Sequence, residues 1–81
     1  MAVMIYTMEG CPFCEKAKAF LSELGIPYVE QVAMFGSEEW RQMRAATGNS
    51  ALPQLVVNDV SIGGYADLVN LEASGELYRE L

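Results

Sequence analysis

Residues 2–14 read AVMIYTMEGCPFC, an apolar run followed by a turn and then by the only two cysteines of the chain. The run is typical of a β-strand that is buried on both faces. Cys11 stands where the N-cap of a following helix would lie, and Pro12 falls at the first helical position, where its fixed φ is favourable. Cys14 then lies one turn into the helix. We therefore expect a strand over residues 2–6 and a helix that opens at the cysteines.

Two cysteines separated by two residues at such a turn indicate a thiol–disulfide redox site. The unpaired N–H groups and the dipole at a helix start favour negative charge, so they favour the thiolate of Cys11. The thiolate is the attacking form of a cysteine. Cys11 is therefore the predicted catalytic nucleophile, and Cys14 is the predicted catalytic residue that resolves the mixed disulfide.

Three other interpretations of the cysteine pair are weaker. A structural zinc site needs four ligands, and the chain has no histidine and no third cysteine. A structural disulfide across so short a loop would contribute only about 2 kcal/mol to stability before strain is subtracted. Two thiols paired by chance would not be expected to enclose a proline at a helix start. Redox chemistry is the favoured interpretation.

The composition limits the class of protein. The 81 residues suffice for one domain, spanning 1–81, with a small core. Five basic against eleven acidic side chains give a net charge of −6, which argues against binding to nucleic acid or to an anionic membrane surface. No apolar run approaches the ~20 residues that would span a membrane. The first residues lack a basic segment, so we expect no signal peptide and a cytoplasmic location.

The remaining patterns predict alternating strands and helices. Apolar residues at helical spacing follow Phe13 as far as Gly25, and Phe13 itself suits either the core or the wall of a binding groove. A strand is expected over residues 28–32, and a helix is expected between Ser37 as N-cap and Gly48.

The last part of the chain predicts a hairpin and a final helix. Residues 55–57 and 60–62 would pair across the turn at Asn58-Asp59. Asp67 would cap a helix that is interrupted near Gly75. The predicted order is β-α-β-α-β-β-α, which is an α/β fold with a single mixed four-stranded sheet and helices on both faces.

Short motifs along the whole chain carry a family resemblance. They are Ile5-Tyr6-Thr7, Cys11-Pro12-Phe13-Cys14, Ala17-Lys18, Pro53-Gln54 and Ile62-Gly63-Gly64 followed by Asp67-Leu68. In this order and at this spacing, they resemble the small bacterial dithiol glutaredoxins. The resemblance implies a thioredoxin fold, a cis Pro53 that faces the cysteines, and glutathione-dependent reduction of protein disulfides or of glutathione mixed disulfides.

The resemblance also implies a binding groove for glutathione, which serves the family as reductant and co-substrate. Carried over residue by residue, its lining comprises Phe13, Leu52, Pro53, Gly64, Tyr65, Ala66 and Asp67. The backbone of Leu52 would pair with the cysteinyl part of glutathione, and residues 65–67 would hold its γ-glutamyl end. The expected partners are glutathione and disulfide-containing proteins, the expected state is a monomer, and no metal is expected.

Three positions depart from the family pattern. Met8 stands where the family usually has Lys or Arg, so we expect a less stabilised Cys11 thiolate and weaker glutathione binding. Ala51 replaces a threonine, and Tyr65-Ala66 replaces a polar pair, with Tyr65 bulky enough to cover part of the groove. Two alternative functions stay open: a glutaredoxin-like protein reduced by a thioredoxin reductase, and a glutathione-assisted carrier of a [2Fe–2S] cluster, against which Pro12 argues.

Overall fold

A computed structural model describes residues 3–81, so Ala2 of the first predicted strand lies outside the described residues. Within residues 3–81 a single sheet contains β1 (Val3–Thr7), β2 (Val29–Val32), β3 (Gln54–Val57) and β4 (Val60–Gly63). The strands lie in the order β2-β1-β3-β4. β1 and β2 are parallel, whereas β3 is antiparallel to both β1 and β4. The predicted mixed four-stranded sheet of the thioredoxin fold is confirmed.

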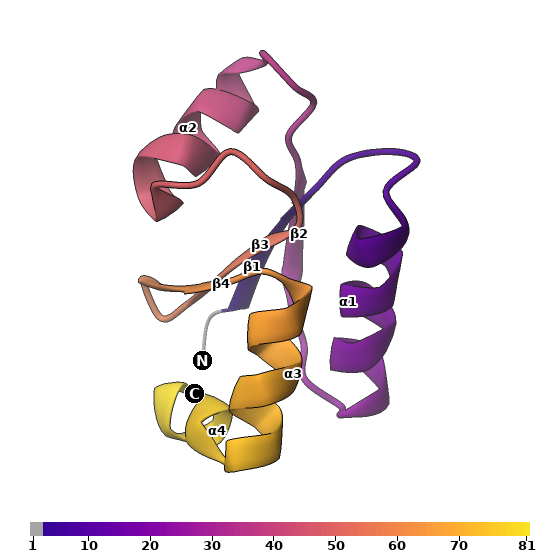
Figure 1. Cartoon of the computed structure of the whole chain (residues 1–81), viewed down its shortest axis with the longest axis vertical. Coiled ribbons are helices and arrows are strands. Elements are labelled where there is room, and N and C mark those ends of the chain that lie inside the picture. The colour runs from indigo at the N-terminus through magenta and orange to yellow at the C-terminus, as the bar shows by residue number, and fades with distance from the viewer. Residues whose placement is uncertain (1–2) are drawn as a thin grey trace.

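The helices of the described chain are α1 (Pro12–Glu23), α2 (Glu38–Thr47), α3 (Tyr65–Ser74) and α4 (Glu76–Glu80). Figure 1 shows α1 and α3 side by side, with α2 on the other side of the sheet. The predicted final helix is divided at Gly75, whose φ of +82° ends α3 before α4 begins. None of the helices formed by residues 3–81 has the length and apolar character that crossing a membrane requires.

The main core lies between the sheet and the helices α1, α3 and α4. It contains Val3, Ile5, Leu55 and Val57 from the sheet, and Ala17, Leu21, Leu68 and Leu77 from the helices. β1 alternates between buried and half-buried residues, so the expectation of a strand buried on both faces is wrong for one face. The reason is that α2 contributes a single buried side chain, Met43, and covers its face of the sheet only in part.

Local capping signals place the helices and the hairpin as predicted. Ser37 caps α2 by accepting the backbone N–H of Trp40 at 3.1 Å. Asn58 and Asp59 both have positive φ, as the tight turn of a two-residue hairpin requires. The second strand begins at Val29, one residue later than predicted, because Tyr28 packs against the core before the strand pairing starts.

Asp67 lies inside α3, so its predicted place as the N-cap residue is wrong. Gly64 occupies the N-cap position, and Asp67 is the third helical residue. Its carboxylate reaches back and accepts the backbone N–H of Gly64 at 3.0 Å. Asp67 therefore stabilises the same helix end from within the first turn.

Candidate functional site

Cys11 and Cys14 lie at the first turn of α1, as the sequence predicts. Cys11 is the N-cap residue and Pro12 is the first helical residue. The backbone N–H of Cys14 donates a hydrogen bond to the Cys11 sulfur, with a nitrogen–sulfur distance of 3.2 Å. Both thiols are free, and Cys11 is half-buried whereas Cys14 is fully buried. The helix start thus presents one sulfur to solvent and keeps the other beneath it.

The environment of Cys14 favours its neutral form. Burial first, and the hydrogen bond with the Cys11 side chain second, raise the pKa of the Cys14 thiol from 9.0 to about 12. Lys18, one turn along α1, lowers this pKa only weakly. Cys14 is therefore protonated at neutral pH. The hydrogen bond that the backbone N–H of Cys14 donates to the Cys11 sulfur is one that a thiolate at Cys11 accepts well.

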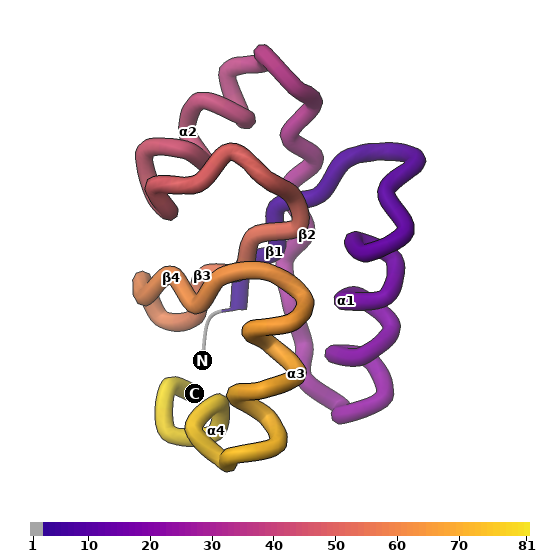
Figure 2. The backbone as a smooth tube through the Cα atoms, in the orientation of Figure 1, coloured from indigo at the N-terminus to yellow at the C-terminus, as the bar shows by residue number. Residues whose placement is uncertain are grey.

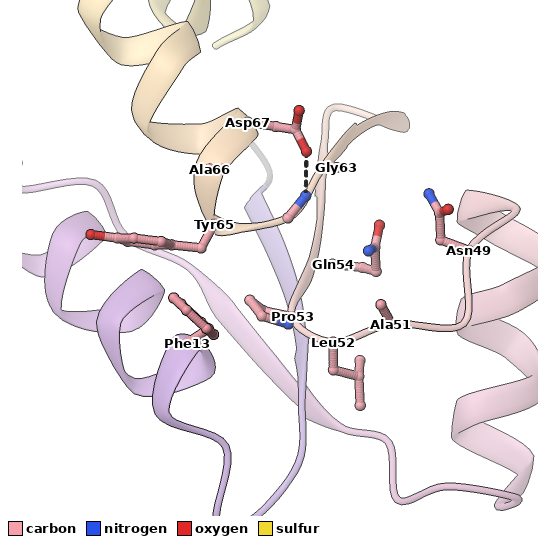
Figure 3. Close-up of a pocket in the computed structure, with 11 residues that line it drawn as sticks. Phe13, Asn49, Ala51, Leu52, Pro53, Gln54, Gly63, Tyr65, Ala66 and Asp67 are labelled. Atoms are coloured by element: carbon pink, nitrogen blue, oxygen red, sulfur yellow. Dashed lines mark hydrogen bonds between the residues drawn. The ribbon is translucent and has the colours of Figure 1, made fainter.

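A groove of about 390 Å³ opens beside the cysteines, a volume typical of small-ligand sites (Figure 3). Its lining includes all seven residues that the family resemblance implies for glutathione, namely Phe13, Leu52, Pro53, Gly64, Tyr65, Ala66 and Asp67. Asn49, Ala51, Gln54 and Gly63 complete the lining. The structure therefore brings the predicted residues together, and their role toward glutathione stays a prediction.

The segment between α2 and β3 forms the edge of this groove nearest the thiols. Figure 2 shows this connection crossing toward the side of the sheet on which α1 begins. The Leu52–Pro53 peptide bond is cis, as the resemblance implies. The Cys11 thiol donates to the carbonyl oxygen of Leu52, with the sulfur 3.9 Å away. The backbone beside Pro53 thus lies within reach of any group bonded to the Cys11 sulfur.

Two aromatic rings build the wall of the groove on the side of α1. The Phe13 side chain is 55% exposed, which places Phe13 in the wall and excludes the alternative of a core residue. The Tyr65 ring lies 6.0 Å from that of Phe13 and 6.4 Å from that of Phe20, between ring centroids. Tyr65 therefore leans onto α1 (Figure 3) while it also lines the groove, and whether it covers part of the groove stays a prediction.

The opposite wall is the first turn of α3. The first backbone N–H groups of a helix have no partner within it and attract negative charge. Residues 65 and 66 bring these groups to the groove, and Asp67 adds a carboxylate beside them. One wall thus offers both anion-binding N–H groups and an acceptor for a cation, which suits a zwitterionic amino-acid group.

Sequence reasoning missed two features of the site. The Pro53-Gln54 motif does not predict a role for the Gln54 side chain, which lines the groove. Lys16 places its Nζ atom 5.1 Å from the centre of the Phe13 ring. A helical spacing of three residues could have paired Lys16 with Phe13. A cation therefore lies against the Phe13 ring, which lines the groove, although Met8 replaces the expected cation.

Comparisons with known proteins agree with this geometry. The glutaredoxin family model matches residues 3–62. Glutaredoxin 1 of Rickettsia typhi is 38% identical over 81 residues, which cover 98% of this chain and 78% of the relative. The solution structure of glutaredoxin from Brucella melitensis superposes with a TM-score of 0.82 at 37% identity, covering 98% of this chain and 86% of that one. A buckwheat glutaredoxin–glutathione complex shares the fold, with a TM-score of 0.84 at 20% identity, covering 98% of this chain and 74% of that one.

Proposed function

The chain belongs to the glutaredoxin family of thiol–disulfide oxidoreductases, and from this premise we propose that glutathione is its reductant. The proposed substrates are protein disulfides and mixed disulfides between proteins and glutathione. The observation that carries the proposal is the position of the Cys11 sulfur. It accepts the Cys14 N–H at the start of α1 and lies 3.9 Å from the carbonyl oxygen of Leu52, a residue that lines a ligand-sized groove.

The proposed reaction begins with the Cys11 thiolate. It attacks the glutathione sulfur of a mixed disulfide, so that a Cys11–glutathione disulfide forms and the protein thiolate leaves and takes up a proton. A second glutathione thiolate then attacks the glutathione sulfur bonded to Cys11. This step releases oxidised glutathione, one half of which came from the substrate, and regenerates the Cys11 thiolate. One glutathione thiol is therefore consumed: its sulfur is oxidised while the sulfur of the substrate protein is reduced to a thiol.

A protein disulfide takes the route that also uses Cys14. Attack by Cys11 leaves a mixed disulfide with the substrate and releases the first substrate thiol. Cys14 then loses its proton and attacks the Cys11 sulfur, which releases the second thiol and leaves the Cys11–Cys14 disulfide. Two glutathiones reduce that bond. The high pKa of Cys14 keeps it from competing with Cys11 for the substrate in the first step.

The groove supports a specific placement of glutathione. Its sulfur would meet Cys11, its cysteinyl backbone would pair with Leu52 beside Pro53, and Phe13 would pack along it. The γ-glutamyl carboxylate would meet the N–H groups of Tyr65 and Ala66, and the Asp67 carboxylate would face the α-ammonium group. The related fold of the buckwheat glutaredoxin–glutathione complex supports this placement. The proposal includes a cytoplasmic location and a monomeric state.

Reduction of a glutathionylated peptide with two alternative electron sources tests this function. One reaction contains glutathione with glutathione reductase, and the other contains a thioredoxin reductase without glutathione. We expect turnover with glutathione and none with the thioredoxin reductase. The Cys11→Ser variant is the matched control and should be inactive in both. Turnover with the thioredoxin reductase alone would overturn the proposal.

A further inference from the structure

Trp40 is the single tryptophan of the chain, and its indole N–H donates to the connection between α2 and β3. The acceptor is the carbonyl oxygen of Ser50, 3.3 Å from the indole nitrogen. Ser50 lies two residues before Leu52, whose carbonyl oxygen accepts the Cys11 thiol. Figure 3 shows Ala51 and Leu52 on this connection, between α2 and the groove. Trp40 therefore binds the backbone that leads into the site, although its own side chain does not line the groove.

Side chains, rather than main-chain pairing, hold the connection next to the groove. Among the described residues, no main-chain hydrogen bond joins residues 50–52 to another element. Two side-chain hydrogen bonds hold them instead. The Trp40 indole binds the carbonyl of Ser50, and the Cys11 thiol binds the carbonyl of Leu52. The position of these residues therefore depends on two donors from distant parts of the sequence.

The two hydrogen bonds respond differently to the chemistry at Cys11. The bond to Leu52 needs the proton of the Cys11 thiol, and this proton is absent both from the attacking thiolate and from a mixed disulfide at Cys11. The indole of Trp40 is a donor only and keeps its proton throughout the reaction. In the reacting states, the Trp40–Ser50 bond is therefore the one that still holds residues 50–52.

The indole is itself held in place on the surface of α2. The Phe35 ring lies 4.7 Å from the Trp40 ring, between centroids, although Phe35 is 80% exposed. The Arg44 guanidinium carbon lies 5.2 Å from the centre of the Trp40 ring. Both distances are within the range of favourable contacts between aromatic rings and between a cation and a ring. These contacts orient the indole N–H toward Ser50.

We propose that Trp40 is a positioning residue for the reaction: through Ser50, it keeps the backbone of Leu52 in place to pair with glutathione bonded to Cys11. This inference rests on the proposed function, which places the cysteinyl backbone of glutathione beside Leu52. A backbone that is already in place costs less to order when the ligand binds. Loss of the N–H group should therefore slow reactions that use this pairing, and it should leave the attack of Cys11 on a small disulfide unchanged.

A pair of substrates isolates the contribution of this pairing. One is a peptide in mixed disulfide with glutathione. The other is the same peptide in mixed disulfide with 2-mercaptoethanol, which has no backbone to pair with Leu52. Fully reduced protein reacts with each in a single turnover, so no reductase is needed, and the second-order rate constant for release of the peptide thiol is measured.

Trp40→Phe keeps an aromatic ring and removes the N–H donor, and Tyr78→Phe likewise removes the donor of an aromatic side chain on α4. We expect Trp40→Phe to lower the rate constant for the glutathione substrate about fivefold, the size expected of one ordinary hydrogen bond. The rate constant for the 2-mercaptoethanol substrate should be unchanged, and Tyr78→Phe should alter neither. Equal losses on both substrates, or no loss on the glutathione substrate, would overturn the inference.

An isosteric replacement separates the N–H group from the rest of the indole. Chemical synthesis of the 81-residue chain can place 3-benzothienylalanine at position 40, where sulfur replaces the N–H group and the ring system keeps its size. This chain should lose the same part of the glutathione preference as Trp40→Phe. A preference equal to that of the synthetic wild-type chain would contradict the proposed role. Circular dichroism establishes that each variant is folded.

The wild-type protein separates this inference from the proposed function. Equal rate constants of the wild type with the glutathione and 2-mercaptoethanol substrates would overturn the proposed function itself. A clear glutathione preference of the wild type that survives in full in Trp40→Phe and in the benzothienylalanine chain would overturn only the role of Trp40.

Discussion

Cys11 and Cys14 are chemically the same residue in opposite environments. The Cys11 sulfur lies at the open end of α1 and accepts an N–H group, whereas Cys14 is enclosed by the core. The short spacing in sequence predicts both positions, because a helix start fixes them within one turn. Two features could not be predicted: the direction of the Tyr65 side chain, and the lack of a hydrogen-bond partner for Gln54 Oε1 among the described residues. Both depend on contacts between elements far apart in sequence.

Serine substitutions should separate the roles of the two cysteines. Cys11→Ser should reduce turnover of glutathionylated and disulfide substrates to background, because it removes the attacking sulfur. Cys14→Ser should keep reduction of glutathione mixed disulfides within about threefold, yet lose most reduction of protein disulfides, which requires the resolving thiol. Steady-state rates with the two substrate types check this prediction. Equal loss of both activities in Cys14→Ser would contradict it.

Alkylation should distinguish the cysteines over a wide pH range. Burial holds the pKa of Cys14 at about 12, so its thiol stays protonated and unreactive at pH 7 and pH 9. Iodoacetamide should therefore modify Cys11 alone in the native protein, and both cysteines after denaturation in urea. Peptide mass spectrometry locates the adducts. Modification of native Cys14 at pH 7 would show that its environment differs from that described.

Gln54→Met should stabilise the protein. The buried Oε1 atom loses its hydration on folding and gains no hydrogen bond in return. Its removal should raise the free energy of unfolding by about 1 kcal/mol, as measured by urea denaturation. Gln31→Met, on the edge strand, provides the matched control and should change stability little. A destabilised Gln54→Met would mean that this side chain is important for packing.

At the scale of elements, one polar network joins β1, β2 and α1. The hydroxyl of Thr7 donates to the Glu30 carboxylate at 2.7 Å, and Lys18 donates to the same oxygen at 3.1 Å. Lys18 also pairs with Glu15 at 3.0 Å. Hydrogen bonds with these two carboxylates raise the pKa of Lys18. The network holds the helix that carries the cysteines against the edge of the sheet.

Glu30→Gln tests this network through its pH dependence. The Thr7 hydroxyl first, and Lys18 second, lower the pKa of Glu30 below its ordinary value of 4.5. Because the folded-state pKa is the lower one, this contribution to stability is present above about pH 4.5 and disappears as the pH falls through the folded-state value. Glu30→Gln should reduce stability at pH 7 by no more than about 1 kcal/mol, since the pair is partly exposed.

Urea denaturation of both proteins at pH 7 and pH 3 measures the effect of Glu30→Gln. The difference in free energy of unfolding should shrink at pH 3, where the carboxylate of the wild-type protein is increasingly protonated. A difference that is independent of pH would mean that the charge of Glu30 contributes nothing.

The elements differ in how far their sequences predict them. The N-cap serine and C-terminal glycine of α2 and the Asn58-Asp59 hairpin are local signals, and all three are found where predicted. The sequence predicts the start of α3 too late, because Asp67 is a residue type that is frequent at the N-cap. The hydrogen bond from the Gly64 N–H, and the close packing of Gly63 against the same carboxylate, show that Asp67 reaches back from within the helix.

On the scale of the whole molecule, charge should influence which substrates approach fastest. The net charge is −6, and Glu9 and Glu15 are exposed in the segment around Cys11. A glutathionylated peptide with a net positive charge should react several-fold faster than a negatively charged one at low salt. The difference should largely vanish at ~0.5 M salt, where charges are screened within a few ångströms. A preference that is unaffected by salt would contradict electrostatic steering.

The most direct test of the central claim is capture of glutathione by Cys11. Reduced Cys14→Ser protein, which cannot resolve an adduct, is incubated without oxygen with oxidised glutathione or with hydroxyethyl disulfide, and the products are identified by mass spectrometry. The account predicts a single glutathione adduct on Cys11, formed much faster than the hydroxyethyl adduct. Equal rates with the two disulfides, or an adduct elsewhere, would contradict glutathione recognition at this groove.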